Sequence, residues 1–146
     1  MSDLASEASI RRLLFLIDAS DRSRQLLDHA QALQSAGQAL EVVLLYVIEP
    51  VRCWEVLKFR SEAEVAQHFA ERAGIFLQLA AARLQAAGIP CRGYCRTGDP
   101  ATLLRALAEE QQCTALVIPR QTCLGLPLGL QRRLQRRPGT VPVLAL

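Results

Sequence analysis

The chain lacks long apolar runs, a strong excess of one charge and an even set of cysteines, and each lack excludes a class of protein. No stretch approaches the ~18 consecutive apolar residues of a membrane-spanning helix. The first nine residues are polar and acidic and lack the order of an export signal, a basic region followed by an apolar one. We therefore expect a flexible N-terminus over residues 1–10 and a cytoplasmic location.

Charge and cysteine content narrow the class further. The formal net charge is +3, which does not by itself indicate a nucleic-acid partner. Five cysteines, an odd number in a chain expected to be cytoplasmic, argue against a disulfide framework. With 146 residues, 51% of them hydrophobic, the chain suits one globular domain with one core.

Apolar segments bounded by turn residues alternate along the chain with segments of helical periodicity. The run LLFLI, which ends just before Asp18, is typical of a strand buried on both faces. Residues 90–97 alternate in polarity instead, which predicts an edge strand with one wet face. The other predicted strands cover residues 40–48, 114–119 and 141–146. The predicted helices cover residues 20–37, 61–87, 99–112 and 128–137, and residues 51–60 are a loop or an irregular helix.

This order of strands and helices predicts a single α/β domain over residues 11–146. Alternation of the two implies right-handed crossovers and a parallel, Rossmann-like sheet with helices on both faces. In such sheets ligands bind outside the carboxyl ends of the strands, where the winding reverses. Asp18 ends the first buried strand at this edge and should face the loop 119–129. Asp18 either binds a ligand or only caps the next helix, and the sequence is consistent with both interpretations.

The ordered set of motifs resembles the universal stress protein family. LFLIDASDRS is similar to the first strand and turn of that family, and LLYVIEP to its second strand and exit. RTGDPATLL is similar to its Gly-Asp-Pro helix start, and TALVIP and VPVLAL to its last two strands. The resemblance runs from about Arg11 to Leu146. It implies a five-stranded parallel sheet of order 3-2-1-4-5, an architecture like that of the adenine nucleotide alpha hydrolases.

In ATP-binding members of this family, the resemblance implies a role for each end of the site. Asp18 would hydrogen-bond the adenine or ribose end, and the base pocket would be lined by Leu16, Ile17 and Val47. The phosphates would lie on a loop of pattern Gly-x2-Gly-x9-Gly-Ser/Thr after the fourth strand. Its glycines let backbone N–H groups approach the phosphates without a Cβ in the way.

That loop is degenerate in this chain. The positions in question are occupied by Pro119, Thr122, Gly125, Gly129 and Leu130. Proline has no N–H to donate, the spacing falls short, and a leucine stands in place of the Ser or Thr. Arg120 adds a charge without replacing the missing donors. Tight ATP binding is therefore not expected, and ATP or AMP remains only an alternative cofactor.

The remaining chemically active side chains form no catalytic or metal-binding constellation. Cys91 and Cys95 would lie about 13 Å apart on a strand, too far for a disulfide or a shared metal. We expect the cysteines to be buried small hydrophobes, with Cys123 in the loop the one to test for reactivity. His29 and His68 fall on predicted helices as partly buried or surface residues. No nucleophile and base come together, so no catalytic residue is predicted and at most slow ATP hydrolysis is expected.

An arginine-rich segment lies within residues 130–137, in the predicted fourth helix. A solvated face near a helix C-terminus, where cations are favoured, explains it, with an acidic partner or an anion as the alternative. It does not indicate nucleic acid, because the chain has little net positive charge.

Three functions remain open from the sequence. The first is a homodimeric regulatory or interaction module of the stress response, with an unidentified protein as its partner and without tight ATP binding. The second is an adenine-nucleotide-binding switch, and the third is a thiol redox sensor. The resemblance implies that the last strand pairs across the dimer, with an interface made by Val141, Val143, Leu144 and Ala145.

Overall fold

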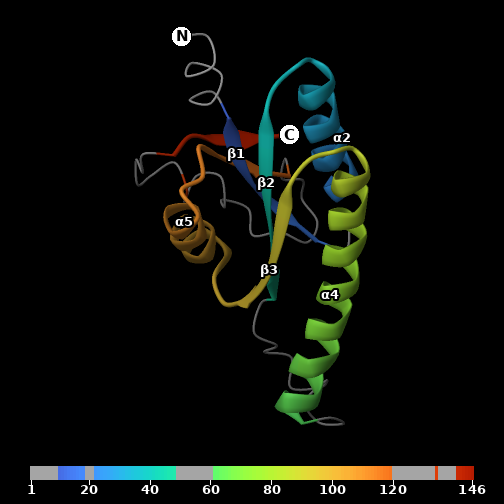
Figure 1. Cartoon of the computed structure of the whole chain (residues 1–146). Coiled ribbons are helices and arrows are strands. Elements are labelled where there is room, and N and C mark those ends of the chain that lie inside the picture. Colours follow the sequence, from blue (N-terminus) through green and yellow to red (C-terminus); the bar gives the residue numbers. More distant parts are fainter. Residues whose placement is uncertain (1–9, 19–21, 49–60, 120–133, 135–140) are drawn as a thin grey trace.

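Five parallel strands form one sheet in the order β3-β2-β1-β4-β5, which confirms the predicted α/β fold and strand order (Figure 1). The computed structural model describes residues 10–18, 22–48, 61–119, 134 and 141–146. Its elements in chain order are β1 (Arg11–Ile17), α2 (Arg22–Ser35), β2 (Leu40–Ile48), α4 (Glu62–Ala86), β3 (Cys91–Thr97), α5 (Pro100–Glu110), β4 (Ala115–Ile118) and β5 (Val143–Ala145).

The central strand β1 divides the core into two layers. Its five apolar residues are all buried, and because side chains alternate along a strand they point in turn to opposite faces. Leu13, Phe15 and Ile17 pack with α2 and α4, in what we call the α2–α4 layer. Leu14 and Leu16 pack with α5, in what we call the α5 layer. The apolar part of β1 is therefore buried on both faces, as expected of a strand at the centre of a parallel sheet.

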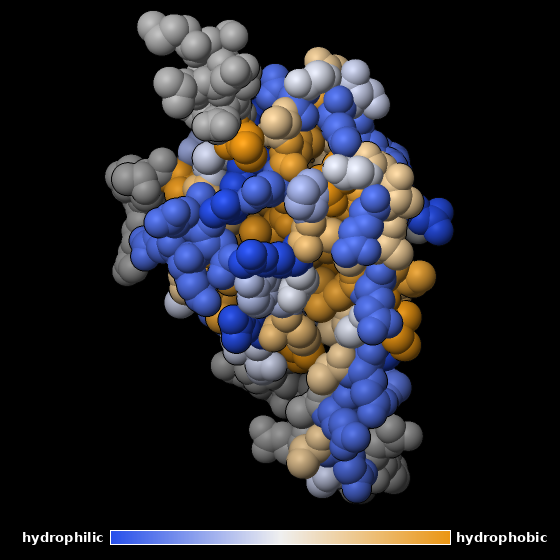
Figure 2. Space-filling view, viewed as in Figure 1, coloured by the Kyte–Doolittle hydropathy of each residue, from blue (hydrophilic) through white to orange (hydrophobic). Residues whose placement is uncertain are grey.

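Helices cover the two faces of the sheet unequally. The helices α2 and α4 lie on one side and α5 on the other (Figure 1). The N-terminal half of α4 projects past the carboxyl ends of β2 and β3 (Figure 1). Its outer surface is largely hydrophilic (Figure 2), although Ile75 and Leu79 are exposed on it. The long helix thus builds a wall beside the edge of the sheet where a ligand is expected.

The predicted helix boundaries are confirmed by their capping contacts. Ser61 precedes α4, and its hydroxyl accepts a hydrogen bond from the Glu64 amide at 3.2 Å. The same helix ends before Gly88, which has a φ of 81°. This left-handed conformation costs glycine no steric strain, and it lets the chain turn into β3.

The two edge strands differ from their predicted forms. β5 covers only Val143–Ala145, although backbone bonds from Leu116 to Pro142 and from Leu146 to Ile118 extend its pairing with β4. The prediction that only one face of β3 is exposed to solvent is wrong. Tyr94 is half-buried against the α5 layer, and Cys95 on the opposite face is exposed. An edge strand has a neighbour on one side only, so neither of its faces is fully covered.

Candidate functional site

The candidate site lies at the carboxyl edge of the sheet, where β1 lies between β2 and β4. The connections leave in opposite directions there, because β2 lies on one side of β1 and β4 on the other. Leu16 of β1 and Val47 of β2 both contact the α5 layer. Asp18 follows the end of β1, and its carboxylate lies beside Ser23 of α2. Two of the predicted site residues thus share one face of the sheet, and Asp18 follows directly at the end of β1.

Ile17 does not share that face. It is 2% exposed and belongs to the α2–α4 layer, with Leu13 and Phe15. Its side chain therefore points away from those of Leu16 and Val47, because neighbouring residues of a strand alternate. The structure does not bring all the predicted base-pocket residues together, and the mismatch follows from strand geometry alone.

Asp18 is fixed locally by Ser23 in the first turn of α2. The Asp18 amide donates to the Ser23 hydroxyl oxygen at 2.9 Å. That hydroxyl in turn lies 3.0 Å from the Asp18 carbonyl oxygen and 3.3 Å from Oδ1 of its carboxylate. The half-buried aspartate is thereby oriented at the strand end by its own backbone and by the helix that follows.

Three side chains near this edge were missed by the sequence analysis. Tyr46 of β2 stacks on Phe76 of α4, with ring centroids 6.3 Å apart. Burial raises the pKa of Tyr46 above its usual value, while the positive charge of Arg72 opposes this and the negative charge of Asp18 adds to it. The tyrosine hydroxyl therefore lies in the field of charges from both β1 and α4. The signal in the sequence was a polar-tipped residue inside the apolar run LLYVI.

The start of α5 lies at the same edge of the sheet, directly after the end of β3. The Gly98 amide donates to the Ile48 carbonyl at 3.0 Å, which ties the end of β3 to the end of β2. The Asp99 carboxylate caps α5 by accepting from the Thr102 amide at 3.1 Å and its hydroxyl at 2.9 Å. The predicted pattern of an aspartate cap with Pro100 at the first helical position is confirmed.

The phosphate side of the predicted site is described only at its first residue. Pro119 is buried and follows β4 directly, so no amide N–H is available where the loop begins. The remaining predicted loop positions lie outside the described residues; they are Arg120, Thr122, Gly125, Gly129 and Leu130. Leu134, in the predicted fourth helix, is helical and 4% exposed, and its carbonyl accepts a hydrogen bond from Arg105 of α5.

Other reactive side chains in the described part of the chain are dispersed. Cys91 is half-buried and Cys113 is buried, as expected of small hydrophobes, whereas Cys95 is exposed, so this expectation was wrong for Cys95. Cys123 lies outside the described residues. Within the described ranges, no three His, Cys, Asp or Glu side chains are grouped to hold a metal ion.

Both histidines lie on described helices, His29 on α2 and His68 on α4. His29 is half-buried and His68 is exposed, which confirms their predicted positions. No helix among the described residues is long and apolar enough to cross a bilayer. The described part of the candidate site brings together an apolar wall, one oriented carboxylate and the first turn of α2.

Comparisons with known proteins agree with this fold. No curated protein matches the chain. Among solved structures, hypothetical protein MJ0577 superposes with a TM-score of 0.75 at 21% identity, covering 93% of this chain and 94% of that one. A universal stress protein from Burkholderia pseudomallei gives 0.73 at 24% identity, covering 94% and 95%. A universal stress protein in complex with cAMP gives 0.62 at 22% identity, covering 93% and 95%.

The family assignment depends on the sequence rather than on these superpositions, because identities this low show the fold alone. The model of the universal stress protein family matches residues 9–130, which is most of the chain. The match spans the oriented aspartate at the end of β1, the start of α5 and the end of β4. The chain belongs to the universal stress protein family.

Proposed function

We propose that the chain is a homodimeric regulatory or interaction module of the stress response, acting on an unidentified protein partner without holding ATP tightly. The observation that carries this proposal is Pro119. It is buried at the end of β4, where the loop that would hold phosphates begins, and it has no backbone N–H to donate. Leu130 adds to this, because the hydroxyl expected after the last glycine is missing.

The second candidate is an adenine-nucleotide switch that recognises the nucleoside more than the phosphates. It is supported by Leu16 and Val47, which share one face of the sheet, and by Asp18, which ends β1 at the switch point. A carboxylate beside an apolar wall can accept hydrogen bonds from a ribose or a base and pack against the base. The relative bound to cAMP shows that this fold holds an adenosine monophosphate in at least one protein.

Calorimetric titration of the purified chain with ATP and with AMP separates the two candidates. No heat with either nucleotide, and no nucleotide released on heat denaturation, supports the interaction module. Micromolar binding of AMP that Asp18→Ala abolishes supports the switch. The matched control is Asp28→Ala on the exposed side of α2, which should leave any such binding unchanged. Micromolar binding of ATP would overturn the first candidate.

The dimer is proposed to form through β5. Among the described strands, β5 pairs with β4 alone, so no described strand covers its other edge. Leu144 is 40% exposed, and it pairs with Val117, a residue of the α2–α4 layer. Beside it lies an apolar cavity of about 210 Å³ that also involves His29 and Val117. A second copy of β5 would satisfy the open backbone groups and cover this apolar surface.

Leu144→Lys should convert the dimer into a monomer, because it places a charge on the exposed face of β5. Val143 is a poorer choice, since it packs against the α5 layer and a lysine there would also disturb the core. The matched control is Leu79→Lys, an equally large change at a leucine exposed on α4. Light scattering that finds a dimer in both variants, or a monomer in the unmodified chain, would contradict this interface.

A further inference from the structure

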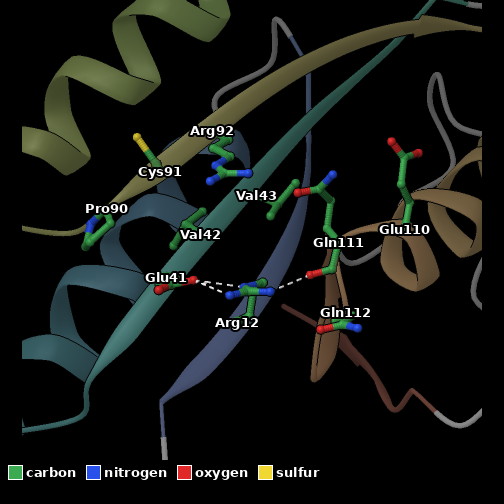
Figure 3. Close-up of a pocket in the computed structure, with 10 residues that line it drawn as sticks. All are labelled: Arg12, Glu41, Val42, Val43, Pro90, Cys91, Arg92, Glu110, Gln111 and Gln112. Carbon is green, nitrogen blue, oxygen red and sulfur yellow. Dashed lines mark hydrogen bonds and ion pairs between the residues drawn. The ribbon is translucent and has the colours of Figure 1, made fainter. Parts of the chain in front are cut away.

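A polar pocket of about 460 Å³ lies at the amino ends of the strands, at the opposite edge of the sheet from the candidate nucleotide site (Figure 3). Its walls come from the first residues of β1, β2 and β3 and from the end of α5. The volume falls in the ~300–1,000 Å³ range of small-molecule sites. None of the predicted nucleotide-site residues within the described ranges lines this pocket.

The floor of the pocket is held rigid by one arginine. Arg12 directs Nε and Nη2 to Oε2 of Glu41, each at 2.8 Å. Its Nη1 donates to the Gln111 carbonyl oxygen at 2.7 Å. The three contacts join β1, β2 and the end of α5, so the pocket is preorganised before any ligand enters. Among the described residues these contacts use only Oε2 of Glu41, so Oε1 is able to accept a hydrogen bond from a ligand.

The charges around the pocket form two poles. Arg12 and Glu41 neutralise each other, which leaves the exposed Arg92 of β3 as the positive pole. It carries no ion pair with a described residue. Glu110 and the C-terminal end of α5, where helix carbonyls concentrate negative charge, form the opposite pole. The carboxamide of Gln111 lies between them and points toward Arg92 (Figure 3).

We propose that this pocket binds a small zwitterion of the free amino acid class. Arg92 would pair with the carboxylate in the two-point manner that a guanidinium allows. The ammonium would lie toward Glu110, Oε1 of Glu41 and the end of α5. None of the described residues that line the pocket is aromatic, so it offers a nucleobase no ring to stack on. The proposal is independent of whether the other edge of the sheet binds a nucleotide.

Titration of the isotope-labelled full-length chain with each standard amino acid, followed by amide NMR, tests this assignment. At least one amino acid should shift the amides of Arg92, Gln111 and Gln112 in a saturable way. Its N-acetyl form lacks the ammonium and its amide form lacks the carboxylate, so each should bind at least tenfold more weakly. No saturable shift at about 10 mM of any amino acid overturns the proposal. Equal binding of the blocked forms overturns the zwitterion.

Two arginines of β3 supply a matched pair of variants. Arg92→Ala should weaken the binding at least tenfold. Arg96→Ala should leave it unchanged, because Arg96 is also exposed but lies outside the pocket, over the Tyr94 ring at 5.5 Å from its centroid. Asp18→Ala at the far edge should also leave it unchanged. Equal losses in both arginine variants would mean that a general positive charge, not this pocket, holds the ligand, and the proposal would fail.

Discussion

Replacing Arg12 by methionine should lower the free energy of unfolding by about 2 kcal/mol. Arg12 and Glu41 have 38% of their side-chain surface exposed, so solvent screens their ion pair and it contributes about 1 kcal/mol. The hydrogen bond to the Gln111 carbonyl contributes about 1 kcal/mol more. Methionine keeps the length and the apolar stem but makes neither contact. For a chain of this size the loss corresponds to a fall in melting temperature of about 6 °C.

Chemical denaturation of Arg12→Met beside Glu41→Gln separates the two contributions. Glu41→Gln removes the ion pair but leaves the Gln111 contact, so it should cost about half as much. Salt at about 1 M should weaken the ion-pair share and spare the other. A loss below about 0.5 kcal/mol for Arg12→Met is the size of an ordinary surface substitution, and it would refute the view that this side chain joins three elements.

Three further predictions concern the ends of α5. Gln112 has a φ of 55°, so Gln112→Gly should raise the free energy of unfolding by about 1 kcal/mol in urea denaturation; a decrease would contradict this. Asp99→Ala should cost about 1 kcal/mol through the lost cap, whereas Asp99→Asn should cost less; equal costs would argue against capping. Burial raises the pKa of Cys113 from 9.0 to about 11. The unfolded chain therefore releases this proton first, and roughly 2 kcal/mol of stability should be lost as pH rises from 9 to 11. Unfolding of Cys113→Ala across the same pH range should lack that share of the loss, and identical profiles would refute it.

The layered sheet could be predicted because burial on both faces leaves a strong trace in a sequence. The run from Leu13 to Ile17 has no polar residue, and only a central parallel strand buries every residue of such a run. The helix caps Ser61 and Asp99 could also be predicted, because each capping residue lies next to its helix in the sequence. Both signals depend on neighbours within a few positions along the chain.

The candidate site was less accessible to prediction, because it depends on residues far apart in sequence. Nothing near Tyr46 indicates that Arg72 and Phe76 will lie beside it, since α4 reaches that edge only by extending past the strands. The grouping of Ile17 with Leu16 failed because residues next to each other on a strand point to opposite layers. The amino-end pocket was missed entirely, as its walls join residues some 99 positions apart, Arg12 and Gln111.

The two edge strands of the sheet, β3 and β5, form borders of different chemistry. This difference affects how many copies of the chain could assemble by pairing strands. β3 carries Arg92 and Arg96, charges that oppose the approach of another strand, whereas β5 is apolar and short. A molecule with two permissive borders could add neighbours without limit and grow into a ribbon. If two copies pair through β5, as proposed above, no second apolar border among the described strands is left for a third copy to pair with. In the proposed dimer, the arginines of β3 would disfavour the addition of a further copy at the opposite border of the sheet.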